Sequence, residues 1–266
     1  MKKLIPIFSA IFVSFTAFGT SFASPLLGTQ SNRIYSVDSF SGAASFSANV
    51  SGVNSFSALA GAAGSLYGVN GSANIYSLDD QTGAAMLIGS IGGGLNVITT
   101  LAGDAGGNLY GTVLGNVYSI DPATGAGTLI GALGSGINAV NSLAATAVGA
   151  LFGESGGSLY SIDTSTGAAS LVGALGTVNF FNDMASDASG NLYGTVAGNL
   201  YSVDTSSGLA TSIGSLGSVN FLDTLASIEV VNIPEPTSFI LFVFGFVIFI
   251  SYYLLQNIDG RDRRYR

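Results

Sequence analysis

A tetrapeptide of the form Tyr-Ser-[Val/Ile/Leu]-Asp recurs five times along the chain, and this repeat constrains the fold more than any other feature. The copies begin at Tyr35, Tyr76, Tyr118, Tyr160 and Tyr201, so their starts are 41 or 42 residues apart. A period in the low forties with several short β-rich segments is typical of the blades of a β-propeller. Helical repeats of similar length need amphipathic helices, which the 38 glycines of this chain disfavour.

Each repeat contains four short segments that favour β-strands. In the copy that runs from residue 179 to residue 217 we predict strands at residues 180–185, 192–196, 200–203 and 210–216. Large apolar residues recur at two positions of the repeat, and we expect them to pack between neighbouring blades. The first position holds Phe56, Ile98, Val140, Phe181 and Leu222, and the second holds Leu59, Leu101, Leu143, Met184 and Leu225.

The two ends of the repeat region hold complementary parts of one blade. A Leu-Leu-Gly segment that starts at Leu26 matches the second strand of the repeat, whereas residues 220–231 match only the first strand. Together they complete a fifth blade, which closes the ring without an exposed edge. The sequence therefore predicts an all-β domain over residues 24–232: a five-bladed β-propeller with four-stranded blades, closed by a C-terminal innermost strand.

Two kinds of aspartate-containing turn recur in the repeats. One follows each tetrapeptide, as in Asp204-Thr-Ser-Ser-Gly208, and has the aspartate and glycine of a hairpin loop. The other begins at Asp104 or Asp187 and has a spacing that superficially suggests a calcium loop. The full ligand pattern of an EF-hand is missing. We therefore interpret both turns as structural and predict neither a metal site nor a cofactor.

The first 23 residues have the form of a secretory signal peptide. Lys2 and Lys3 precede an apolar run over residues 4–18, and Ser21-Phe-Ala23 places small residues at the −3 and −1 positions of a cleavage site. The alternative is an uncleaved anchor helix, which the shortness of the run and Pro6 disfavour. Both interpretations place the body of the protein outside the cytoplasm.

The C-terminal segment has the features of a membrane span. Residues 237–255 carry no charge, and a helix of this length covers roughly 28 Å of hydrocarbon. A basic cluster follows at Arg261, Arg263, Arg264 and Arg266. The positive-inside rule holds such a cluster in the cytoplasm, so the residues before the span are expected outside.

The motif Pro234-Glu235-Pro236 stands directly before this predicted helix. The motif, the helix and the terminal arginines together resemble the PEP-CTERM sorting domain over residues 233–266. This resemblance implies recognition by an exosortase, a membrane protease-transpeptidase, and an association with the exopolysaccharide and biofilm matrix of Gram-negative bacteria. The sequence departs from the family pattern because residues 256–260 separate the helix from the basic cluster, which Asp262 interrupts. The alternative is a plain C-terminal membrane anchor.

One candidate ligand site follows from the repeat. Propellers bind ligands at the mouth of the central channel, and the position three residues after each repeated asparagine is polar in every copy. We predict a channel ring of Ser57, Thr99, Asn141, Asn182, Asp183 and Asp223 that hydrogen-bonds a polar ligand or holds a cation. The alternative is that these residues are polar only because the channel contains water.

The residue inventory disfavours catalysis and several classes of partner. The chain has no His and no Cys, and residues 24–233 hold a single basic residue, Arg33. A Ser-His-Asp or Cys-His arrangement is therefore excluded, and we predict that the protein is not an enzyme. A body with one positive charge also disfavours binding to nucleic acid or anionic lipid. Neutral or cation-bridged polysaccharide remains compatible with this charge.

These features predict an exported, non-catalytic surface or extracellular-matrix protein of a Gram-negative bacterium, anchored transiently in the inner membrane. Its propeller is expected to act as a structural module or to bind a ligand such as exopolysaccharide. Its expected partners during export are signal peptidase and an exosortase-like transpeptidase. The alternatives are a calcium-dependent propeller hydrolase or lactonase, and a permanently anchored adhesin.

Overall fold

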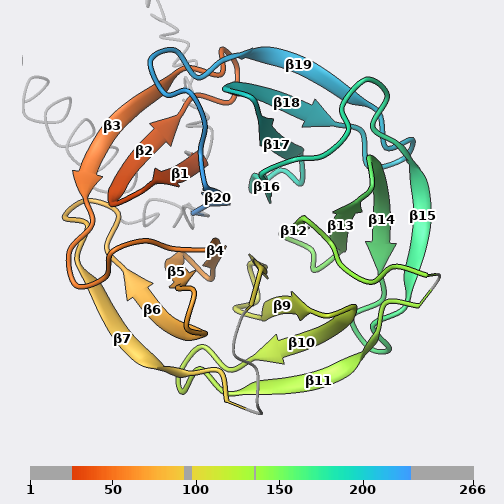
Figure 1. Cartoon of the computed structure of the whole chain (residues 1–266), viewed down its shortest axis with the longest axis horizontal. Helices are drawn as coiled ribbons and strands as arrows, with labels where there is room; N and C mark the ends of the chain where they lie inside the picture. The colour runs from red at the N-terminus through yellow and green to blue at the C-terminus, as the bar shows by residue number, and fades with distance from the viewer. Residues whose placement is uncertain (1–25, 93–97, 135, 229–266) are drawn as a thin grey trace, which may run out of the picture. The chain divides into compact units, whose positions relative to one another are not determined.

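The repeat region folds into five four-stranded antiparallel sheets arranged around a central axis (Figure 1). The computed structural model describes residues 26–92, 98–134 and 136–228, and the statements below concern these residues. The predicted all-β, five-bladed propeller with four-stranded blades is confirmed. Within the described ranges no helix is long and apolar enough to cross a membrane; the predicted signal peptide, Pro-Glu-Pro motif, span and basic cluster lie outside them.

The strands of each blade follow one another from the axis outwards (Figure 1). Blade 1 contains β20 (Thr224–Ser227), β1 (Leu26–Gln30), β2 (Arg33–Val37) and β3 (Ala44–Asn49). Blade 2 contains β4 (Ala58–Ala62), β5 (Ser65–Val69), β6 (Asn74–Leu78) and β7 (Ala85–Ser90). Blade 3 contains β8 (Thr100–Gly103), β9 (Leu109–Val113), β10 (Asn116–Ile120) and β11 (Gly127–Ala132). Blade 4 contains β12 (Ser142–Ala145), β13 (Leu151–Ser155), β14 (Ser158–Ile162) and β15 (Ala169–Ala174). Blade 5 contains β16 (Asp183–Ser186), β17 (Leu192–Val196), β18 (Asn199–Val203) and β19 (Ala210–Ser215).

Blade 1 closes the ring by pairing the two ends of the repeat region. β20 runs antiparallel to β1, with Leu26 opposite Ser227 and Thr29 opposite Thr224. The hydroxyl oxygens of Thr29 and Thr224 are 2.7 Å apart and buried. The predicted closing strand is confirmed, although its ladder is shorter than residues 220–231.

The two ends of the propeller have different loops. We call the end at which the innermost strands begin the mouth face; it carries the blade-to-blade connections and the hairpins between the second and third strands of each blade. We call the opposite end the far face; it carries the aspartate turns of the repeat. Leu26 and Ser227 are paired at the far face, so both chain ends of the propeller lie there.

The repeated Leu-Tyr-Gly element is explained by packing within each blade. Its glycine lies against the large apolar residue that precedes the innermost strand and leaves room for it. A Cβ on Gly194 would lie 2.6 Å from Cγ of Phe181, and a Cβ on Gly111 would lie 3.1 Å from Cδ1 of Ile98. Both apolar residues are fully buried. Burial of such a side chain contributes about 1.5–3 kcal/mol. The two apolar positions predicted from the repeat are buried in all five blades.

The strand bounds of blade 5 agree closely with the sequence prediction. β17 has the predicted limits, whereas β16 starts at Asp183 instead of residue 180. The reason is that Phe181 leaves the ladder: its side chain is buried, and its backbone N–H donates to the Glu154 carboxylate of blade 4 at 3.4 Å. A side chain from the preceding blade thus replaces the strand partner.

The aspartate turns of the far face have the predicted hairpin chemistry. In blade 5 the Asp204 carboxylate accepts the backbone N–H groups of Ser206 and Ser207 at 2.7 and 3.2 Å. Gly208 has a φ of 81°, the left-handed conformation that glycine adopts without strain. Hydrogen bonds from the Ser206 hydroxyl and the turn N–H groups lower the pKa of Asp204. The second kind of turn is also structural, because the Asp187 carboxylate accepts from the backbone of Ser189 and Asn191, the Asn191 amide and the Tyr193 hydroxyl.

The close packing of Phe181 on Gly194 gives a testable prediction. A Gly194→Ala variant is expected to lose about 1–3 kcal/mol of unfolding free energy, because the added methyl group overpacks the blade. Equilibrium unfolding in urea measures this loss. The control is Gly71→Ala, since a Cβ at Gly71 meets no atom within 4 Å. Equal stability of the two variants would contradict the packing role of Gly194.

Candidate functional site

Five of the six predicted ring residues lie at the mouth face, one in each blade. Ser57, Thr99, Asn141 and Asp223 are exposed and Asn182 is half-buried. Their side chains hydrogen-bond to the scaffold: the Asn182 amide donates to the Leu222 carbonyl of blade 1 at 3.3 Å, and the Ser57 hydroxyl donates to the Ile98 carbonyl of blade 3 at 3.3 Å. The ring therefore holds neighbouring blades together as well as facing solvent.

Asp183, the sixth predicted ring residue, has a different position. Its side chain is buried, with 3% exposure, and its carboxylate accepts the N–H groups of Met184 and Leu225, both at 2.9 Å. Burial raises the pKa of Asp183 well above its usual range, and the two N–H groups oppose that rise. Because Leu225 belongs to β20, Asp183 ties blade 5 to the closing strand.

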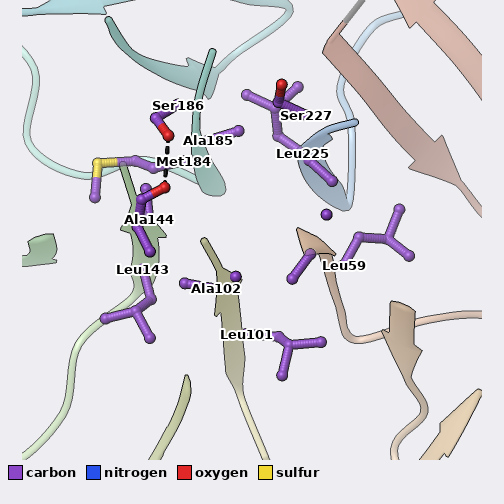
Figure 2. A pocket seen from close by; sticks show the side chains of 15 residues that line it. Leu59, Leu101, Ala102, Leu143, Ala144, Met184, Ala185, Ser186, Leu225 and Ser227 are labelled. Atoms are coloured by element: carbon purple, nitrogen blue, oxygen red, sulfur yellow. Dashed lines mark hydrogen bonds between the residues drawn. The ribbon is translucent and has the colours of Figure 1, made fainter. Parts of the chain in front are cut away.

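The channel itself is almost closed. Small residues of the innermost strands surround the axis, among them Ala102, Ala144 and Ala185 (Figure 2), and the space between them has a volume of about 20 Å³. A Cβ on Gly103 would lie 2.5 Å from the carbonyl oxygen of Gly61, so the backbones of neighbouring blades are in contact. A space of this size holds about one water molecule. A ligand larger than water is therefore excluded from the channel.

A buried polar layer lies directly beneath the mouth. The residue after each ring position faces a residue of the second strand, and polar pairs occupy this place in four blades: Thr29 with Thr224, Thr100 with Thr112, Ser142 with Glu154, and Asp183 with Thr195. Sequence reasoning missed this layer. The available signal was the polar residue that follows the repeated glycine, at Thr29, Thr112, Glu154 and Thr195.

Glu154 is the most deeply buried carboxylate of this layer. Its two oxygens accept hydrogen bonds from the Gly157 N–H at 2.9 Å, the Asn141 amide at 3.1 Å and the Phe181 N–H at 3.4 Å. These donors come from blade 4 and from the segment that enters blade 5. Glu154 therefore links these two blades, as Asp183 links blades 5 and 1.

An open polar cleft lies on the mouth face between blades 1 and 2. Its volume is about 770 Å³, within the range of roughly 300–1,000 Å³ that small-molecule sites occupy. The cleft is lined by Ser31, Asn32, Val50, Gly52, Val53, Asn54, Ser55, Asn70, Gly71 and Tyr76. None of these residues carries a charge. The repeat pattern does not predict this cleft, because its walls come from three loops that belong to different repeats.

Charge is segregated between the two faces of the described propeller. The far face carries the exposed or half-buried Asp38, Asp79, Asp80, Asp121, Asp163 and Asp204, in addition to the buried Asp104 and Asp187. The mouth face has two exposed charged residues in its described part, Arg33 and Asp223, because Asp183 and Glu154 are buried. No group of three metal-ligating side chains occurs among the described residues. The mouth face is thus polar and close to neutral, whereas the far face is acidic.

Comparison with known proteins identifies the fold and no family. No family model matches the chain, and no curated protein is similar to it. Among solved structures, a chain from a study of the de novo evolutionary emergence of a symmetrical protein is 21% identical with a TM-score of 0.57, covering 78% of this chain and 99% of that one. A chain in the crystal structure of a nidogen/laminin complex is 14% identical with a TM-score of 0.55, covering 76% of this chain and 81% of that one.

The buried position of Asp183 predicts a specific pH dependence of stability. A carboxyl whose pKa is raised in the folded state favours folding while both states are protonated, below about pH 3.9. That contribution is lost as the pH rises toward the folded-state pKa. As the pH rises from 4 to 7, the wild type therefore loses stability that an Asp183→Asn variant keeps. The unfolding free energy of the variant is expected to rise relative to that of the wild type over this range. Urea unfolding across this range measures the difference, and a difference that is independent of pH contradicts the assignment.

Proposed function

We propose that this protein is a non-catalytic binding module whose mouth face recognises a neutral, polar ligand. The observation that carries this proposal is the segregation of charge, which leaves an uncharged cleft of about 770 Å³ on the face opposite the acidic turns. Asparagine and serine side chains both donate and accept hydrogen bonds, which suits a ligand rich in hydroxyl groups. An exopolysaccharide has this chemistry.

The absence of catalysis is part of the same proposal. The chain contains no His and no Cys, so a carboxylate or a hydroxyl would have to perform any acid–base or nucleophilic step. The two carboxylates beneath the mouth, Asp183 and Glu154, accept backbone N–H groups that fix their positions. These hydrogen bonds suit a structural role better than proton transfer to a ligand.

Export and sorting complete the proposal. The signal-like residues 1–23, the Pro234-Glu235-Pro236 motif, the apolar residues 237–255 and the terminal arginines support an exported protein whose tail is removed by an exosortase-like enzyme. The mature propeller would then lie at the cell surface or in the extracellular matrix. A chain in the nidogen/laminin complex has a similar fold, so this fold is compatible with a binding role.

Affinity electrophoresis of the full chain tests the binding role. Gels that contain dextran, galactomannan or hydroxyethylcellulose are expected to retard the protein in at least one case, with or without a chelator. Alginate is expected to have no effect, because a chain of net charge −8 repels an anionic polymer. A Ser55→Phe variant should lose the retardation, since the aromatic ring fills the cleft. Unchanged mobility of the wild type in all three neutral polymers overturns the proposal.

The intact mass of the protein exported by its native host tests the sorting role. The expected mass lacks residues 1–23 and the hydrophobic segment that follows Pro236. A mass that includes residues 239–266 contradicts removal of the tail and supports a permanent anchor. A mass that includes residues 1–23 contradicts cleavage of the signal.

A further inference from the structure

Two half-exposed aromatic rings lie on the mouth face beside the ring residues. Phe180 and Phe221 occupy the same repeat position in the segments that enter blades 5 and 1, and they are 48% and 44% exposed. Each stands two residues before a polar side chain of the ring, Asn182 or Asp223. An exposed aromatic ring next to an amide or carboxylate offers both an apolar surface and a hydrogen-bonding group.

These aromatic residues are continuous with the polar cleft. The Asn182 amide donates to the carbonyl of Leu222, the residue after Phe221, at 3.3 Å. Asp223 then accepts the backbone N–H of Ser31 at 2.8 Å, and Ser31 lines the cleft. Hydrogen-bonded neighbours therefore connect blade 5 to the wall of the cleft that blade 1 provides. We call this surface, from Phe180 through Phe221 and Asp223 to the cleft, the mouth track.

The cleft end of the track departs from the five-fold repeat. The position of Phe180 and Phe221 is aromatic only in those two copies of the repeat, and in the segment that enters blade 2 it is Ser55, a small residue that lines the cleft. Blade 2 also has a longer hairpin, in which the side-chain oxygen Oδ1 of Asn70 accepts the backbone N–H groups of Ser72 and Asn74 at 3.1 and 3.0 Å. The Asn70 amide donates to the Tyr76 hydroxyl at 3.2 Å, which orients both side chains at the cleft wall.

We propose that the mouth track binds an extended chain of neutral sugar units, with one end in the cleft and the following units on Phe180 and Phe221. The track spans two blades and the cleft, and its one charged side chain is the acidic Asp223, which suits a polymer of hydroxyl-rich units better than an acidic ligand. The amide and hydroxyl groups of the cleft match sugar hydroxyls, and the aromatic rings match the apolar faces of sugar rings. This inference rests on the proposed function and adds the extended form of the ligand and the residues that its further units contact.

Isothermal titration of the full chain with neutral oligosaccharides of one to six units tests this inference, with oligomers cut from whichever polymer retards the wild type. Affinity is expected to rise with length beyond two units and then to level off. A Phe180→Ala/Phe221→Ala double variant should lose roughly tenfold in affinity for the hexasaccharide and little for the disaccharide that occupies the cleft. Phe40→Ala is the matched control, because Phe40 is 83% exposed on the far face.

The outcomes separate this inference from the function on which it rests. Wild-type affinity that stops rising at two units overturns the track and leaves the cleft as a binding site. The track is also overturned if the double variant binds the hexasaccharide with wild-type affinity and has the same thermal unfolding midpoint as the control. Failure of the wild type to bind any neutral polymer overturns the proposed function itself. Equal losses in Phe40→Ala and the double variant also overturn the track, because the effect would not depend on the face.

Discussion

The antiparallel pairing of β20 with β1 is the interaction on which the rest of the molecule depends. It joins segments that are 195 residues apart in the sequence through the hydroxyl contact between Thr29 and Thr224. Without it blade 1 would have three strands and an unpaired edge at the axis. The carboxylate of Asp183 also depends on this pairing, because the N–H that it accepts belongs to Leu225 of the closing strand. Closure thus positions both the ring of blades and the polar layer beneath the mouth.

The repeat supplies a scaffold, and the candidate site arises where the repeats differ. A large apolar residue packed on a glycine recurs in every blade, and it makes the five sheets equivalent in shape. The hairpin at Asn70 is longer than its equivalents in the other blades, and it lines the cleft on one side of the mouth together with the small residue Ser55. Phe180 and Phe221 break the equivalence of the blades on another side. An asymmetric ligand surface on a nearly symmetric body requires only a few substitutions in connecting loops, which tolerate change better than strands.

The fold could be predicted well from the sequence because the repeats can be aligned with one another. Five copies of one pattern reveal which residues are equivalent, so an apolar position that recurs in every copy can be assigned to the core. The ring residues could be placed at the mouth for the same reason. Asp183 was misjudged in its exposure, since its equivalents are Ala58, Thr100, Ser142 and Thr224 and the pattern does not show which strand face is buried. The cleft could not be predicted, because its walls come from loops whose lengths and residues differ between repeats.

The placement of both chain ends at one face has a consequence for how such a domain can be used. Leu26 and Ser227 are opposite each other at the end of β1 and β20 that carries the acidic turns. Any leader, linker or fused partner therefore joins the propeller at that end, and the connecting loops of the other end stay free of covalent attachments. A propeller of this kind can be anchored, released or fused to another module at the far face without altering its recognition surface.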